Sequence, residues 1–242
     1  MRWVALFGQP NTGKTSLFNH LTNLNQSVIN YPGSTVDIST GQLINHPEIM
    51  IIDLPGVHSF IPQSDDERLT LSAITDLKAI IDSAHQSPDL IIMVIDACQP
   101  SRHLAMAKRL IDSGYAVIIV LTMIDQLEKD GNYIDHIKLS NELGTSVFKI
   151  NGRKPLNIDE LIDGICLNSV PCGRLIDLKS FHLNDLLDAY NWSESILTKC
   201  QIVTQHKQSF DFDKILLHPI FGYFTFFGIM ILFFSLIFYV SA

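Results

Sequence analysis

The sequence is short of cysteine, of basic residues and, near its end, of charge of any kind. Its four cysteines form no C-x-x-C pair, and no Cys, His or Asp cluster has metal-ligand spacing, so we expect reduced, packed thiols in the cytoplasm.

The 17 basic and 25 acidic residues give a net charge of -8, which argues against broad nucleic-acid binding. The N-terminus enters an apolar run without a charged leader, so we expect no cleavable signal peptide.

A phosphate-binding pattern lies close to the N-terminus. The apolar run at residues 3–7 precedes a G-x-x-x-x-G-K-[ST] motif, and a helix-prone stretch follows it. A buried strand, a glycine-bounded loop and a helix start turn backbone N–H groups toward an anion. Lys14 would neutralise the β- and γ-phosphates, and the Thr15 hydroxyl would hold Mg²⁺. The predicted phosphate-binding residues are Gly8, Gln9, Pro10, Asn11, Thr12, Gly13, Lys14, Thr15 and Ser16.

Two later segments have the pattern of switches that respond to the third phosphate. Residues 25–37 are polar, and we predict an irregular segment there with switch residues Gly33, Ser34, Thr35 and Val36. Thr35 would reach the γ-phosphate and Mg²⁺; an ordinary loop threonine is the alternative. The second switch follows a predicted strand at residues 49–52 and has the D-x-x-G form. Its residues are Asp53, which would organise Mg²⁺ through water, Leu54, Pro55 and Gly56, whose amide would sense the γ-phosphate.

Val57 follows this glycine, where many regulatory GTPases carry a glutamine that positions the attacking water. An aliphatic side chain cannot orient water, so we expect slow intrinsic hydrolysis. Backbone groups or the polar residues 64–68 would then hold the water. For residues 64–68 the alternative is a solvated start to a helix over 66–83.

A base-recognition motif follows two buried strands. The apolar runs at residues 90–96 and 116–121, joined by a helical stretch at 101–113, predict a β-α-β unit of a parallel sheet. Next comes a motif of the [NT]-x-x-D type with the predicted guanine-binding residues Thr122, Met123 and Asp125. The Asp125 carboxylate would accept hydrogen bonds from guanine N1 and N2 that adenine cannot supply. Beyond a helix at 133–143 and a strand at 146–150, the guanine O6 would meet a backbone amide of Asn151, Gly152 or Arg153. An ATPase is the alternative.

These elements predict an α/β fold with three parts. A doubly wound P-loop GTPase domain occupies residues 1–170 and closes with a helix at 158–167. Apolar residues spaced three and four apart predict a small all-helical domain over 171–217. The last 28 residues, after Lys214, hold no Asp, Glu, Lys or Arg, and a helix over 219–240 would span roughly 33 Å. We therefore predict a transmembrane helix within 218–242; a soluble protein with a remnant apolar tail is the alternative.

The ordered motifs resemble those of the bacterial ferrous-iron transporter FeoB family. They are GQPNTGKTSLFN (8–19), YPGSTV (31–36), DLPGVHSF (53–60), TMID (122–125) and HPIFG (218–222). The resemblance implies GTP hydrolysis to GDP coupled to ferrous-iron uptake across the bacterial inner membrane, with the GTPase and helical domains in the cytoplasm. It also implies that Asn11 is a candidate K⁺ ligand, since the family's asparagine at this position is associated with potassium-stimulated hydrolysis.

The chain also departs from the family pattern. The family usually has asparagine at the place of Thr122 and Ser-Ala at the place of Asn151 and Gly152. Its members continue through many more membrane helices, so the chain as given is not expected to transport iron alone. The hypothesis is a GTP-binding, slowly hydrolysing cytoplasmic part of such a transporter. Its partners would be GTP and the remaining membrane helices, with iron contacted only indirectly, no nucleic acid, and a homo-oligomer left open. The alternative is a membrane-tethered switch that senses nucleotide with little hydrolysis.

Overall fold

The structure, a computed structural model, describes residues 1–23, 26–30, 37–81, 84, 87–151, 157–167, 183–203 and 221–241. The chain divides into two compact units, Met1–Thr204 and Gln205–Ala242.

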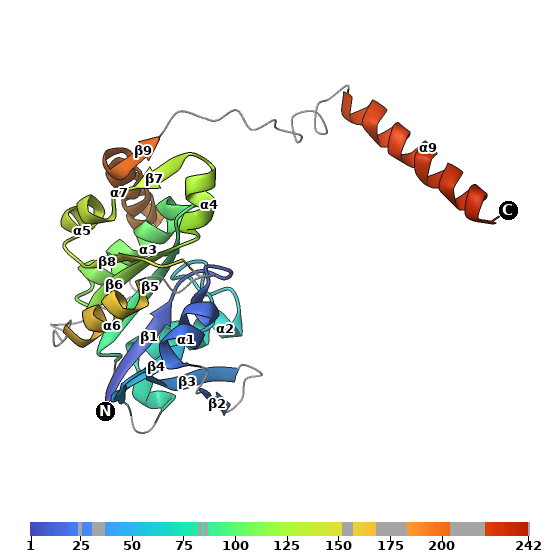
Figure 1. Ribbon diagram of the computed structural model, residues 1–242. Coiled ribbons are helices and arrows are strands. Elements are labelled where there is room, and N and C mark those ends of the chain that lie inside the picture. Colours follow the sequence, from blue (N-terminus) through green and yellow to red (C-terminus); the bar gives the residue numbers. More distant parts are fainter. Residues whose placement is uncertain are drawn as a thin grey trace. The chain divides into compact units, whose positions relative to one another are not determined.

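Seven strands of the first unit form one mixed sheet in the order β2-β3-β4-β1-β5-β6-β8 (Figure 1). β1 pairs in parallel with β4 and β5, and β6 pairs in parallel with β5 and β8, whereas β3 is antiparallel to both β2 and β4. The carboxyl ends of the five parallel strands therefore meet at one edge, where open α/β sheets bind ligands. The strands are Arg2–Phe7 (β1), Gln26–Asn30 (β2), Asp37–Leu43 (β3), His46–Asp53 (β4), Leu90–Asp96 (β5), Val117–Thr122 (β6) and Val147–Lys149 (β8).

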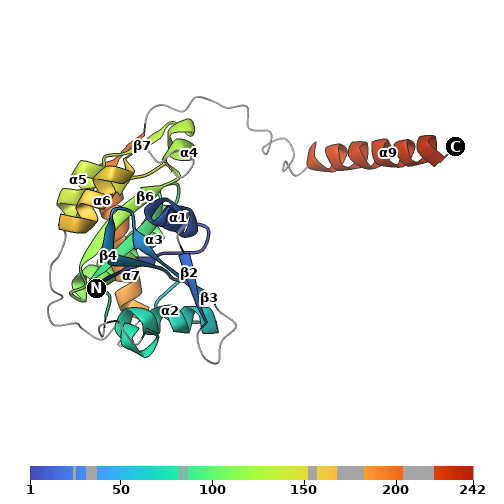
Figure 2. The ribbon, with the colours of Figure 1, turned by 60° about the horizontal axis from the view of Figure 1, so that its bottom comes forward.

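Helices cover both faces of this sheet (Figure 2). Along β1, Trp3, Ala5 and Phe7 join one buried cluster, whereas Val4 and Leu6 join the other, as the alternation of a strand requires. The first cluster includes side chains of α2 (Asp65–Thr75), α3 (Pro100–Asp112), α5 (His136–Leu143) and α7 (Leu183–Cys200). The second includes side chains of α1 (Lys14–Thr22) and α6 (Ile158–Leu167). The predicted α/β fold class is confirmed.

Three predicted segments differ from the structure. β2 lies inside the stretch predicted to be irregular, because the backbone of Gln26–Asn30 pairs with the edge of β3 despite its polar sequence. The helix predicted over 66–83 ends at Thr75 and is followed by a short 3₁₀ turn, Leu77–Ala79. The helix predicted from residue 133 begins at His136, because Asp135 accepts hydrogen bonds from the first backbone N–H groups and caps it.

The helix α7 belongs to the core of the first unit. Its Ile196, Leu197 and Cys200 are buried in the cluster that also holds α3, and Lys108 Nζ lies 4.7 Å from the ring centroid of Trp192. After α7, β9 (Gln201–Val203) pairs antiparallel with β7 (Asn132–Ile134). The domain division at residue 170 and a separate helical domain over 171–217 stay predictions, since 168–182 and 204–220 lie outside the described residues.

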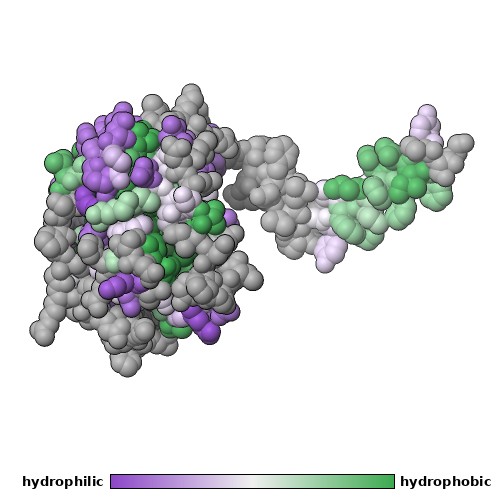
Figure 3. Space-filling view, turned by 90° about the horizontal axis from the view of Figure 1, so that it is seen from below, coloured by the Kyte–Doolittle hydropathy of each residue, from purple (hydrophilic) through white to green (hydrophobic). Residues whose placement is uncertain are grey.

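The second unit contains α9 (Phe221–Ser241), whose visible face is mostly apolar (Figure 3). Its window Gly222–Tyr239 has a mean hydropathy of 1.9, and none of that window is buried. Among the described residues it is the one helix long and apolar enough to cross a membrane. It overlaps the span predicted at residues 219–240 from residue 221 onward.

Candidate functional site

The loop between β1 and α1 has a backbone that only particular residues can adopt. A Cβ on Gly8 would lie 2.4 Å from the carbonyl oxygen of Val94, so this position accepts only glycine. Asn11 and Gly13 have positive φ angles of 62° and 87°, and the N–H of Leu17 donates to the Gly13 carbonyl at 2.9 Å as α1 begins. The first turn of α1, which the structure describes in full, has no acidic side chain, so its positive end suits an anion.

Lys14 is a buried cation beneath this loop, with 7% of the residue exposed. Its ammonium donates to the carbonyl oxygens of Gln9 at 2.8 Å and Gly8 at 3.3 Å, and the Thr12 hydroxyl donates to the same Gln9 oxygen at 2.9 Å. Burial lowers the pKa of Lys14, while the nearby Asp53 carboxylate opposes that shift. The positive charge of the Lys14 ammonium is therefore held against the backbone of the loop, next to Gly8 and Gln9.

Asp53, the last residue of β4, lies beside the start of α1. The Thr15 hydroxyl donates to Asp53 Oδ2 at 2.8 Å, whereas the buried Oδ1 has no hydrogen-bond partner among the described residues. Burial raises the pKa of Asp53, and the Thr15 hydrogen bond and Lys14 charge oppose that rise. Mg²⁺ prefers oxygen ligands, and a carboxylate with an orphaned oxygen next to a hydroxyl fits such a site.

The D-x-x-G segment lies directly against the phosphate loop. A Cβ on Gly56 would be 2.6 Å from the backbone nitrogen of Pro10, so the two backbones touch at that point. The N–H of Val57 donates to the Gly8 carbonyl at 3.1 Å, and the Val57 side chain is fully buried in the apolar core. The fold thus brings together the two predicted motifs, Gly8 to Ser16 and Asp53 to Gly56.

The residues after Val57 are bonded to Glu67, a residue that is only 5% exposed. Its two carboxylate oxygens accept the N–H groups of His58 at 2.9 Å and Gln63 at 2.7 Å. Ser64 caps α2 by accepting the Glu67 N–H at 3.2 Å. Burial opposes ionisation of Glu67, but these backbone N–H groups outweigh it and lower the pKa of the carboxyl. The polar stretch at 64–68 is therefore the start of a helix, and its glutamate closes the loop before it.

A cavity of about 440 Å³ adjoins the loop and the end of β6. It brings together five residues predicted from sequence, namely Gly13, Ser16, Thr122, Met123 and Asp125. Sequence reasoning missed its other lining residues, which are Leu17, His20, Asp96, Cys98, Gln126 and Ile150. Helical spacing after Gly13 could have indicated Leu17 and His20, and the end of a parallel strand could have indicated Asp96.

Within this cavity, Thr122 contacts the phosphate loop. Its hydroxyl donates to the carbonyl of Thr12 at 2.7 Å and also lies 3.1 Å from the carbonyl of Ile95. Met123 follows with a positive φ of 55°, and Asp125 lies in the first turn of the short helix α4 (Ile124–Lys129).

The remaining predicted site residues belong to the first switch and to the base loop at 151–153. Asn151 is described and follows Ile150, whose N–H donates to the Leu121 carbonyl at the end of β6. The switch residues Gly33, Ser34, Thr35 and Val36 and the base-loop residues Gly152 and Arg153 lie outside the described residues.

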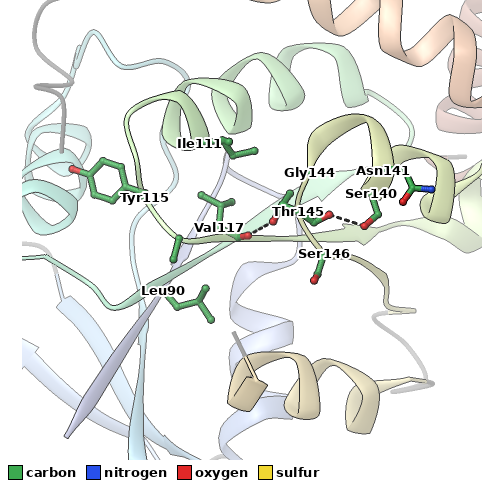
Figure 4. A pocket seen from close by; sticks show the side chains of 10 residues that line it. Leu90, Ile111, Tyr115, Val117, Ser140, Asn141, Gly144, Thr145 and Ser146 are labelled. Atoms are coloured by element: carbon green, nitrogen blue, oxygen red, sulfur yellow. Dashed lines mark hydrogen bonds between the residues drawn. The ribbon is translucent and has the colours of Figure 1, made fainter. Parts of the chain in front are cut away.

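A larger hollow of about 530 Å³ lies at the opposite edge of the sheet, where β5 and β6 begin (Figure 4). Leu90, Val117 and Ser146 mark the strand starts there, and the Ser140 hydroxyl donates to the Thr145 carbonyl. None of its lining residues is charged, so it offers no group to neutralise a phosphate. The charged residues and the predicted site residues therefore lie at the smaller cavity and its adjoining loop.

Comparison with known sequences identifies close relatives. A family model described as Ferrous iron transport protein B matches residues 2–165. A Fe(2+) transporter FeoB of Legionella pneumophila (strain Paris) is 42% identical over 166 residues, which cover 66% of this chain and 21% of the relative. One of Helicobacter pylori (strain J99 / ATCC 700824) is 33% identical over 251 residues, covering 98% of this chain and 37% of the relative. The chain therefore spans well under half the length of these relatives.

Solved structures show the same fold. The cytosolic domain of L. pneumophila FeoB matches with a TM-score of 0.69 and 32% identity, covering 83% of this chain and 99% of that one. A GDP-bound mutant of the S. thermophilus FeoB G-domain matches with a TM-score of 0.62 and 28% identity, covering 82% and 91%. The T. maritima cytosolic domain in GMPPNP form shares the fold at a TM-score of 0.69 and 24% identity, covering 84% and 100%.

Proposed function

We propose that this chain, which belongs to the ferrous iron transport protein B family, binds GTP and hydrolyses it slowly to GDP as the cytoplasmic part of a ferrous-iron importer. The match to the family model confirms the resemblance drawn from the sequence motifs. The fold is that of the family's G-domains. Three points are proposed for this chain. It binds GTP, it hydrolyses GTP, and this hydrolysis is linked to iron uptake.

The arrangement of Lys14, Thr15 and Asp53 beneath the loop carries this proposal. The Lys14 ammonium, which now donates to the Gly8 and Gln9 carbonyls, would exchange them for the β- and γ-phosphate oxygens of a bound triphosphate. Gly56, whose backbone touches Pro10, would offer its amide to the γ-phosphate. The G-domain relative bound to GDP supports a guanine nucleotide as the ligand.

A bound Mg²⁺ would neutralise charge that develops on the β- and γ-phosphate oxygens. Thr15 would be its direct protein ligand and Asp53 its partner through water, with Thr35 as the proposed ligand from the first switch. The support is the hydroxyl–carboxylate pair at 2.8 Å and the orphaned Asp53 Oδ1.

Guanine selectivity is assigned to Asp125, whose carboxylate would accept the N1 and N2 hydrogens. Its place on the lining of the cavity next to Gly13 supports this role. An ATPase remains the alternative, and Asp125→Ala separates the two. The substitution should weaken GTP binding and leave ATP binding unchanged if Asp125 reads guanine. Equal weakening of both nucleotides would contradict the assignment.

Slow hydrolysis follows from Val57. Its side chain is buried and its N–H is bonded to Gly8, so neither group can orient a water molecule. The same observation favours a second candidate function, a membrane-tethered switch that senses GTP and barely hydrolyses it. Asn11, exposed on the loop with a positive φ, is the proposed K⁺ ligand that would supply charge at the phosphates.

Two measurements test the function on the full chain in detergent. Calorimetry with GDP and a non-hydrolysable GTP analogue at millimolar Mg²⁺ should detect binding, and its absence would remove the proposal. Single-turnover hydrolysis in K⁺ and in Na⁺ should show slow turnover that is faster in K⁺. No turnover in either salt would select the sensing switch, and equal rates would remove the role proposed for Asn11.

The membrane role rests on α9 and on relatives named Fe(2+) transporter. We assign α9 to the bacterial inner membrane, with the first unit in the cytoplasm and further membrane helices as its partners. Fractionation should recover the chain with membranes, from which detergent but not salt releases it. Release by salt alone would contradict a spanning helix.

A further inference from the structure

The hydroxyl of Thr122 has two neighbouring hydrogen-bond acceptors and only one proton to donate. Its hydroxyl lies 2.7 Å from the Thr12 carbonyl of the phosphate loop and 3.1 Å from the Ile95 carbonyl of β5. A hydroxyl can donate one hydrogen bond, and both neighbours here are carbonyl oxygens, which can only accept. The donor of Thr122 is therefore engaged by the protein itself.

The same residue also packs on the loop. A Cβ built on Gly13 would find the Thr122 Cγ2 at 3.8 Å as its nearest neighbour, so the threonine methyl covers the glycine from which α1 begins. Thr122 is only 4% exposed, and it lines the cavity together with Gly13 and Asp125. One side chain thus joins the base-recognition strand to the phosphate loop.

Guanine presents acceptors at N7 and O6 and donors at N1 and N2. To read N7, Thr122 would have to donate, which would break its bond to the buried carbonyl of Thr12. Asp125 meets no such conflict, because a carboxylate accepts from N1 and N2 without using a donor. The two residues of one motif are therefore suited to different tasks.

We propose that Thr122 is a positioning residue for the phosphate loop and takes no part in reading the base. This deepens, and rests on, the proposed binding of guanine nucleotides. Loss of the hydroxyl should weaken every nucleotide by the same factor, because the diphosphate site that all of them share is disturbed. Loss of the Asp125 carboxylate should instead change the preference between bases.

The test uses Thr122→Val, which keeps the shape and methyl group but removes the hydroxyl, and Thr122→Ser, which keeps the hydroxyl. Dissociation constants of the full chain in detergent are measured for GDP and for 7-deaza-GDP, in which a C–H replaces N7. Thr122→Val should weaken both by about tenfold, the usual effect of leaving one buried carbonyl unsatisfied, with their ratio unchanged. Thr122→Ser should stay within about threefold of the wild type for both.

Asp125→Asn is the matched control for a residue that reads the base. It exchanges an acceptor for an amide, so its preference should move from GDP toward XDP, whose xanthine has a carbonyl at position 2. Thr122→Val should leave the ratio of GDP to XDP affinity unchanged. These opposite signatures separate positioning from base reading.

Three results overturn the inference. The first is a Thr122→Val variant that loses affinity for GDP and none for 7-deaza-GDP, since that pattern means the hydroxyl reads N7. The second is unchanged affinity for both nucleotides in Thr122→Val. The third, informative even if the valine variant fails to fold, is a Thr122→Ser variant that loses tenfold affinity for GDP and none for 7-deaza-GDP. Wild-type protein that binds no guanine nucleotide instead removes the proposed function itself.

Discussion

His103 should make the stability of this fold depend on pH in the mildly acidic range. The residue lies in α3, is 4% exposed, and its Nδ1 accepts the N–H of Asp96 at 3.3 Å. Burial lowers the pKa of His103 to about 4; the Asp96 charge opposes this, and the Arg102 and Lys14 charges add to it. The imidazole is therefore neutral in the folded protein, with its proton on Nε2.

The sign and size follow from proton linkage. The unfolded chain, with an ordinary histidine pKa of about 6.5, takes up a proton before the folded protein does. The stabilisation is therefore complete above pH 6.5 and is lost as the pH falls toward 4. The full difference corresponds to about 3.4 kcal/mol, and the part lost between pH 7.5 and pH 5 is about 2 kcal/mol.

The assay is equilibrium urea unfolding of the full chain in detergent at pH 7.5 and pH 5. Tryptophan fluorescence reports on the first unit, because both tryptophans, Trp3 and Trp192, lie in it. His103→Gln is the comparison, since its amide oxygen can accept the Asp96 N–H and does not titrate. The wild type should lose about 2 kcal/mol more than the variant on acidification. Equal losses in the two proteins would refute a buried neutral His103.

Three further substitutions test the site. Gly56→Ala should weaken GDP binding by about tenfold or more in calorimetry, because its Cβ would meet the Pro10 backbone at 2.6 Å; unchanged affinity would contradict that contact. Glu67→Ala should lower the free energy of unfolding measured in urea by about 2 kcal/mol, because two backbone N–H groups lose a charged acceptor. A wild-type free energy of unfolding would argue against a stabilising role for these two hydrogen bonds. Asp53→Asn should weaken Mg²⁺-dependent GTP binding roughly 10- to 100-fold with little change when Mg²⁺ is chelated; equal losses with and without Mg²⁺ would point to a structural role.

The chemistry-bearing motifs could be predicted because each depends on residues close together in the chain. The phosphate loop needs a strand, glycines at set positions and a helix start, all within residues 2–22. The parallel strands β5 and β6 are almost continuous apolar runs, and α9 is a long uncharged one. Local backbone conformation and hydropathy are properties of such short windows, and so the α/β class, the phosphate loop and the apolar terminal helix were all recognisable.

Tertiary structure decided what depends on distant segments. The strand β2 exists because the edge of β3 offers it backbone partners, and α7 joins the first core because α3 presents an apolar face. Thr122 and Thr12 are 110 positions apart, so no local pattern could show that the threonine hydroxyl is engaged by the phosphate loop. Burial of Val57 and the hydrogen bonds of Glu67 to the preceding loop also depend on which segments folding brings together. The sequence specifies the type of each side chain. Its hydrogen-bond partner depends on which backbone groups the folded structure places within about 3 Å of it.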